Sequence, residues 1–138
     1  AVASSDATFA TPGVNIGLFC STPMVSLTRN IGRKNAMEML LTGRAVTATE
    51  AQAMGLVNVV VPPEKLDGAV EDLAKTVAGK PRRVLAIGKR TFYEQLELGL
   101  SDAYAHTSAI MAKNMMEADA TEGIEAFLAK RKPRWCDD

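Results

Sequence analysis

The segment LVNVVV at residues 56–61 limits most strongly what this chain can form, because it is the one strong strand pattern in a sequence that otherwise favours helices. Its β-branched residues are typical of a β-strand, and Pro62 and Pro63 end it. A weaker strand is expected at residues 8–10. An isolated pair of strands is only marginally stable in water. We therefore expect the strand at 56–61 to complete a sheet whose other strands lie outside this chain.

Helical patterns fill most of the remaining sequence, because apolar residues recur at three- and four-residue spacing between Gly and Pro residues. Thr47 and Glu50 form a predicted capping box at the start of the third helix. Asp119 and Glu122 form a second predicted box at the start of the last helix. The residues of the second helix expected to face inward are Met37, Leu40 and Leu41. The seven helices are expected at residues 23–31, 34–42, 48–54, 63–78, 82–98, 102–115 and 120–130.

Residues 11–19 are the least regular part of the chain. Thr11, Pro12 and Gly13 predict a turn, and the apolar residues 14–19 predict a loop or a short strand. Functional sites tend to lie in irregular segments, so this stretch is a candidate site region.

The composition argues against several classes of function. The 138 residues include 16 Lys and Arg against 16 Asp and Glu, so zero net charge gives no overall attraction to nucleic acid. No apolar run reaches the roughly 18 residues that a membrane span needs. With His106 as the single histidine, no set of metal ligands is visible. Cys20 and His106 could form a nucleophilic pair; the other interpretation is a small buried thiol and a half-exposed helix histidine.

The basic run KRKPR at residues 130–134 has two interpretations. Cations at the end of a helix are stabilised by the helix dipole. A compact basic cluster beside an aromatic residue, here Phe127, is also suited to hold a phosphate while the ring covers a base. The acidic residues fall mainly on polar helix faces, and no common catalytic motif occurs in the sequence. These residues alone indicate a mostly helical globular domain.

Four segments give more information through their order and spacing: residues 7–12 (ATFATP), 36–43 (AMEMLLTG), 48–57 (ATEAQAMGLV) and 122–127 (EGIEAF). Together they resemble the C-terminal half of the crotonase (enoyl-CoA hydratase/isomerase) superfamily. The resemblance covers the whole chain, although no single segment is diagnostic.

The resemblance implies an α/β fold, the C-terminal part of the family's ββα spiral with a helical tail. Residues 1–62 would belong to the core, and residues 63–138 to a tail that forms the oligomer and covers coenzyme A (CoA). A homo-oligomer is expected, either a trimer or a dimer of trimers. Apolar residues of the tail could then lie between subunits or within the chain's own core, and periodicity does not separate the two cases. These residues include Tyr104, Ile110, Met111 and Met115.

The resemblance also implies where the chemistry takes place. Family members stabilise the oxyanion of an acyl-CoA thioester with two backbone N–H groups, and the hydratases add water with two glutamates. The oxyanion segments and the first glutamate align before Ala1. The second glutamate aligns with Gly13, which has no proton to exchange, so we expect impaired catalysis and a gain of hydration on Gly13→Glu. Cys20, Asn15 or a bound water are alternatives for the missing role. The residues expected to line the acyl pocket are Pro12, Gly13 and Phe19.

At the other end of the ligand, Phe127 and Lys130 match the positions with which family members cover the adenine of CoA held mainly by a neighbouring subunit. Met111 falls where another aromatic residue often lies. The CoA thioester is then the substrate or ligand, and neither a further cofactor nor a metal is expected.

The function that the resemblance implies is that of an acyl-CoA-binding, enoyl-CoA hydratase/isomerase-like protein of fatty-acid metabolism with impaired catalysis. The alternative is a non-enzymatic, oligomerising, CoA-binding interaction protein, which Gly13 and the alignment of the oxyanion segments before Ala1 both favour. A third candidate is isomerisation or thioester hydrolysis, which also needs the oxyanion hole. Acyl-CoA is the expected partner, rather than nucleic acid or a membrane. The implied location is the mitochondrial matrix, with the bacterial cytoplasm as the alternative.

Overall fold

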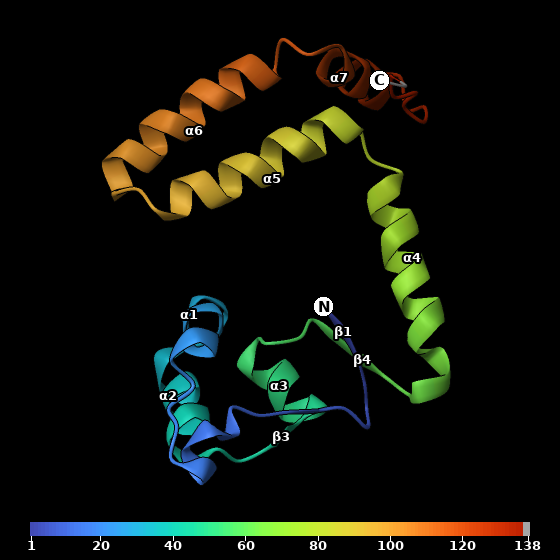
Figure 1. Ribbon diagram of the computed structural model, residues 1–138. Coiled ribbons are helices and arrows are strands. Elements are labelled where there is room, and N and C mark those ends of the chain that lie inside the picture. Colours follow the sequence, from blue (N-terminus) through green and yellow to red (C-terminus); the bar gives the residue numbers. More distant parts are fainter. Residues whose placement is uncertain (137–138) are drawn as a thin grey trace. The chain divides into compact units, whose positions relative to one another are not determined.

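The computed structural model describes residues 1–136 and contains two compact units, Ala1–Leu73 and Ala74–Asp138. The boundary between the units falls within α4 (Leu66–Ala78), which follows the short 3-10 helix η2 (Pro63–Lys65) (Figure 1). Among the described residues, no helix has the length and apolar character needed to cross a bilayer. The expected functional division into residues 1–62 and 63–138 stays a prediction.

The described residues contain two separate two-stranded sheets. β1 (Val2–Ser4) pairs in parallel with β4 (Val59–Val61), and β2 (Thr8–Phe9) pairs antiparallel with β3 (Val46–Thr47). The expectation that the partner strands all lie outside this chain was wrong for one of them, because β1 pairs with β4. Three residues are too few to give an alternating pattern, so the sequence carries no signal for β1.

β4 is shorter than expected because the residues before it complete a helix. α3 (Ala48–Met54) ends at Gly55, whose φ of 85° lies in the left-handed region. The backbone N–H of Leu56 then donates to the carbonyl oxygen of Ala51 at 2.8 Å. Leu56 therefore belongs to the helix C-terminus rather than to the strand.

The core of the first unit lies among its strands, α1 (Ser21–Asn30), α2 (Arg33–Thr42) and α3. Met37 and Leu41 do not face it as expected, since they are 50% and 61% exposed. The apolar spacing identified α2 but pointed to the wrong face of it, because α2 buries Ala36 and Met39 beside Leu40. The buried residues of this core are Ala3, Leu27, Ile31, Ala36, Met39, Leu40, Val46, Ala48, Ala51 and Val57.

The capping box at the start of α3 is confirmed. Thr47 Oγ1 accepts from the Glu50 N–H at 3.2 Å, and Glu50 Oε2 accepts from the Thr47 N–H at 2.7 Å. The hydrogen bond from Thr47, together with Arg44, holds the pKa of the Glu50 carboxyl below its ordinary value. The box fixes the turn from β3 into α3.

Replacing Thr47 by Ala is expected to destabilise the fold by about 1 kcal/mol, because the Glu50 N–H loses its acceptor. Urea unfolding of the full-length protein measures this loss. Thr49→Ala is the matched control, since Thr49 lies within α3 and makes no cap. An equal loss in both variants would contradict the assignment.

The second unit is helical. α5 (Arg82–Leu96) and α6 (Leu100–Asn114) form a hairpin, and α7 (Ala118–Leu128) follows (Figure 1). Among its described apolar residues, only Ala103 and Ala126 are fully buried. Many large apolar side chains of this unit are exposed, including Phe92, Leu96, Tyr104, Met111, Met115 and Phe127.

Candidate functional site

The loop that holds the expected acyl-pocket residues is a short 3-10 helix rather than a strand. This helix, η1 (Pro12–Ile16), ends at Gly17 with φ of 78°. The backbone N–H of Leu18 returns to the carbonyl oxygen of Gly13 at 2.9 Å and closes the loop. Phe19 is 43% exposed, and Pro12 is exposed on the same loop. The loop therefore holds Pro12, Gly13 and Phe19 in one hydrogen-bonded segment with exposed apolar side chains.

Gly13 has no space for a side chain. A Cβ at this position would lie 2.8 Å from both the carbonyl oxygen of Leu18 and Cys20 Sγ. Real Cβ atoms essentially never approach a backbone oxygen this closely, and the Leu18 carbonyl is fixed by the loop. A glutamate at position 13 cannot enter the present loop, which argues against the expected gain of hydration on Gly13→Glu.

The other candidates for acid–base chemistry each lie against a neighbouring group. Cys20 Sγ accepts from the Gly13 N–H at 3.3 Å. The side chain of Asn15 packs where α2 ends, since a Cβ at Gly43 would lie 3.1 Å from it. His106 Nε2 lies 3.1 Å from Glu94 Oε2. Among residues 1–136, no group of three or more His, Cys, Asp or Glu side chains could hold a metal ion.

The second predicted capping box is wrong, because the C-terminal residues use both of its carboxylates. The N-cap of α7 is Glu117, and it makes no side-chain cap. Asp119 Oδ1 instead accepts from the backbone N–H of Cys136 at 2.8 Å. Glu122 accepts from Arg131 and from the backbone N–H of Arg134. The spacing of Asp119 and Glu122 suggested a local cap, but both carboxylates bond to partners 9 to 17 residues away.

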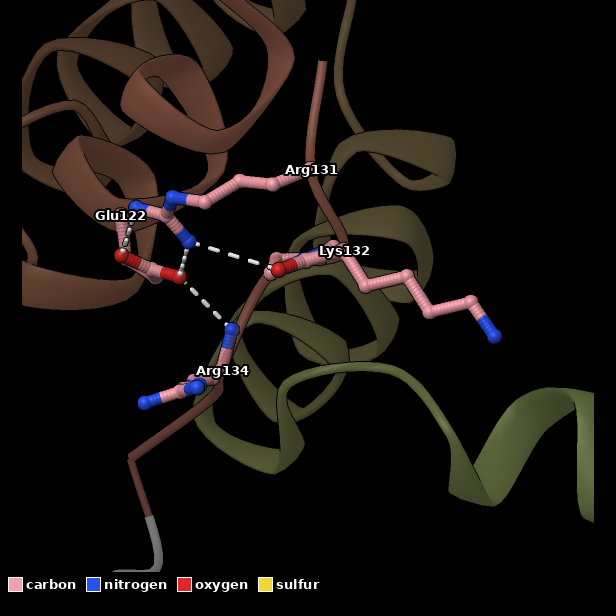
Figure 2. Close-up of a pocket in the computed structure, with 5 residues that line it drawn as sticks. Glu122, Arg131, Lys132 and Arg134 are labelled. Carbon is pink, nitrogen blue, oxygen red and sulfur yellow. Dashed lines mark hydrogen bonds and ion pairs between the residues drawn. The ribbon is translucent and has the colours of Figure 1, made fainter. Parts of the chain in front are cut away.

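Glu122 lies at the centre of this arrangement, in a pocket lined by Arg131, Lys132, Pro133 and Arg134 (Figure 2). Arg131 binds the carboxylate with two nitrogens, at 2.6 and 2.9 Å. These bonds and the Arg134 N–H lower the pKa of the Glu122 carboxyl to about 2. The Glu122 side chain is 21% exposed, so the pair is only partly open to water. The carboxylate is ionised throughout the neutral pH range.

The expected CoA contacts lie where α7 ends. Phe127 is 81% exposed, although it is a large apolar residue. Lys130 is the one described non-glycine residue with a positive φ, at 51°. Its N–H donates to Phe127 O at 3.1 Å, and the Arg131 N–H donates to Ala126 O at 3.0 Å. This is the left-handed helix end at which glycine is usual, so the backbone holds a lysine in a conformation that costs it energy.

Trp135 was not anticipated as a structural residue. Its Nε1 donates to the carbonyl oxygen of Gly79 at 2.9 Å, a partner 56 residues away. Its ring lies against Gly123, where a Cβ would be 3.4 Å from the ring. Nothing in the local sequence signals such a long-range contact.

Comparison with known proteins identifies the class to which this fold and these residues belong. The family model described as enoyl-CoA hydratase/isomerase matches residues 1–138, so the chain belongs to this family, within the crotonase superfamily. A relative named enoyl-CoA hydratase domain-containing protein 3, mitochondrial, from Rattus norvegicus is 52% identical over 135 residues, or 98% of this chain and 45% of that protein. The α/β fold is the C-terminal part of the crotonase fold, as expected.

Two solved structures of enoyl-CoA hydratase family members support this assignment of family and fold. A crystal structure of an enoyl-CoA hydratase from Mycobacterium smegmatis has a TM-score of 0.94 and 51% identity, covering 97% of this chain and 52% of that one. The human enoyl-CoA hydratase domain-containing protein 3 has a TM-score of 0.92 and 50% identity, covering 97% and 53%. The chain thus spans about half the length of the relatives that it matches.

Proposed function

We propose that this protein binds acyl-CoA thioesters as a hydratase/isomerase-like protein whose hydration chemistry is impaired. The observation that carries the proposal is the end of α7, where Phe127 is exposed and Lys130 is held at φ 51°. Unfavourable backbone geometry persists where the surrounding structure imposes it, and it is concentrated at functional sites. An exposed ring near a lysine side chain that extends from a constrained backbone suits the adenine and a phosphate of CoA.

Gly13 supports the impaired chemistry. The resemblance puts the second glutamate of the hydratases at this position, and the closed loop leaves no volume there for any side chain. Pro12, Gly13 and Phe19 would then shape the acyl pocket without transferring a proton. The oxyanion donors of the family would do the electrostatic work in the full-length protein.

A second candidate, a non-enzymatic CoA-binding interaction protein, is favoured by the exposed apolar faces of the second unit. α5 and α6 form a groove with a volume of about 270 Å³ between them, and several of its lining residues are apolar, including Ile87, Phe92 and Met111. Clusters of exposed apolar side chains such as these are typical of protein–protein contact surfaces. Assembly as a trimer or a dimer of trimers would cover it.

The relatives bear on where the protein acts. The rat and human relatives are enoyl-CoA hydratase domain-containing protein 3, and the rat relative is named mitochondrial, which supports a mitochondrial location. The matrix and a role in fatty-acid metabolism are proposed on the family resemblance alone. The similarly close M. smegmatis structure supports a bacterial cytoplasm instead. Acyl-CoA is the proposed partner in either compartment.

Replacing Lys130 by Gly is expected to weaken CoA binding by the full-length protein about tenfold, while stabilising the fold by about 1 kcal/mol. Glycine keeps the left-handed turn without strain but removes the ammonium group. Calorimetric titration with CoA and with dephospho-CoA, which lacks the 3′-phosphate, measures the binding effect.

Lys130→Arg is the matched control, since it keeps the charge at the same backbone position. It should retain most of the affinity and none of the gain in stability. An unchanged CoA affinity of Lys130→Gly at both low and moderate salt would overturn the proposed function.

A further inference from the structure

Residues 131–136 form a C-terminal strap that runs back along α7. Arg131 and Arg134 bond to Glu122, Trp135 lies against Gly123, and Cys136 bonds to Asp119 at the start of the helix. Beyond Arg131, the strap thus contacts α7 between Asp119 and Gly123, in its first half. Both carboxylates of one helix face are therefore used to hold the strap.

The basic cluster at residues 130–134 surrounds a carboxylate, which a site that only attracts a polyanion would not need. Of the cations at residues 130–134, Arg131 is neutralised by the two-nitrogen bond to Glu122. In Figure 2, the ammonium group of Lys132 points away from this carboxylate. Placing an anion in the middle of the cluster weakens its overall attraction for phosphate. Glu122 must therefore contribute something other than charge.

What Glu122 contributes is the fixed position of Lys130. The chain on one side of Lys130 is the end of α7. On the other side, Arg131 is tied to α7 twice, through its N–H to Ala126 O and through its guanidinium to Glu122. With both neighbours held, the left-handed conformation of Lys130 is favoured.

We propose that Glu122 is a positioning residue for the nucleotide end of the acyl-CoA site, acting through Arg131 and the strap to fix the backbone from which the Lys130 side chain extends. This inference rests on the proposed function. Simple electrostatics predicts that removing the negative charge of Glu122 strengthens the binding of a polyanionic ligand such as CoA. The positioning role predicts the opposite, a weaker CoA affinity.

The test uses Glu122→Gln in the full-length protein, with Glu125→Gln as the matched control. Glu125 is an exposed acid on the same helix that interacts with Arg131 only at longer range. Glu122→Gln is expected to weaken binding of CoA roughly tenfold and of dephospho-CoA much less, since the lost contact is to the 3′-phosphate. Glu125→Gln should leave both affinities unchanged or slightly improve them.

Two further measurements separate positioning from a general loss of structure. Backbone amide exchange at Arg134 and Cys136 should accelerate in Glu122→Gln, because these N–H groups bond to Glu122 and Asp119. A double variant, Glu122→Gln with Arg131→Gln, should bind CoA no more weakly than Arg131→Gln alone. A merely structural role would weaken CoA and dephospho-CoA equally.

Tighter CoA binding in Glu122→Gln, or equal weakening of both ligands, would overturn the inference. If Lys130→Gly weakens CoA binding in the same experiment, the proposed function stands and only the role of Glu122 falls. If Lys130→Gly has no effect, the proposed function falls first.

Discussion

Hydration of crotonyl-CoA by the full-length protein is expected to proceed about 10²- to 10⁴-fold more slowly than in a hydratase that keeps both glutamates. One positioned acid–base group contributes a factor of this size, and Gly13 supplies none. The deficit should appear in kcat, because the proposed CoA contacts at Phe127 and Lys130 are retained. Loss of the enoyl thioester absorbance, followed over a range of substrate concentrations, separates kcat from KM.

Two variants make this measurement interpretable. Lys130→Gly should raise KM and leave the residual kcat largely unchanged, because Lys130 does not touch the reacting carbons. Cys20→Ser tests whether the thiol beside Gly13 has taken over the missing role; a collapse of residual turnover would assign it that role. Turnover at the level of a two-glutamate hydratase would overturn the impaired-chemistry proposal.

Replacing Gly13 by Ala is expected to destabilise the protein by about 1–3 kcal/mol, because the new methyl group overlaps the Leu18 carbonyl oxygen and Cys20 Sγ. Gly13→Glu should cost at least as much and should not raise hydration, since the loop must open before the carboxyl group can be placed. Urea unfolding measures both losses.

Gly68→Ala is the matched control for this prediction. Gly68 lies within α4, and a Cβ there would meet no atom within 4 Å. Alanine is a better helix former, so this change should stabilise the protein by about 0.5–1 kcal/mol. A neutral Gly13→Ala, or a gain of hydration in Gly13→Glu, would contradict the closed-loop interpretation.

The sequence predicted features that depend on neighbours along the chain. The Thr47 capping box and the ends of the second and third helices at Gly43 and Gly55 appear as expected, and the strand expected at 56–61 forms over its last three residues. Such features follow from a few consecutive residues and their backbone preferences. The family was identified in the same way, from short segments whose order and spacing along the chain match those of the family.

Features set by distant residues were missed or misassigned. Asp119 and Glu122 have the spacing of a capping box, yet a charged guanidinium and two backbone N–H groups of the strap compete more strongly for them. The available volume beside Gly13 depends on how the loop places Leu18 and Cys20, and this placement cannot be read from the sequence. The inward face of α2 was likewise decided by the elements packed against it.

The parallel pairing of β1 with β4 has a consequence for synthesis of the protein on the ribosome. Val2 pairs with Val59, so the two strands are separated by nearly the entire first unit. Closing so long a loop carries an entropic cost that precedes any gain from the pairing. β1 therefore emerges from the exit tunnel well before its partner, and it cannot pair with β4 until residues 59–61 have also left the tunnel. The helices α1, α2 and α3, whose contacts are local, are free to form during that interval.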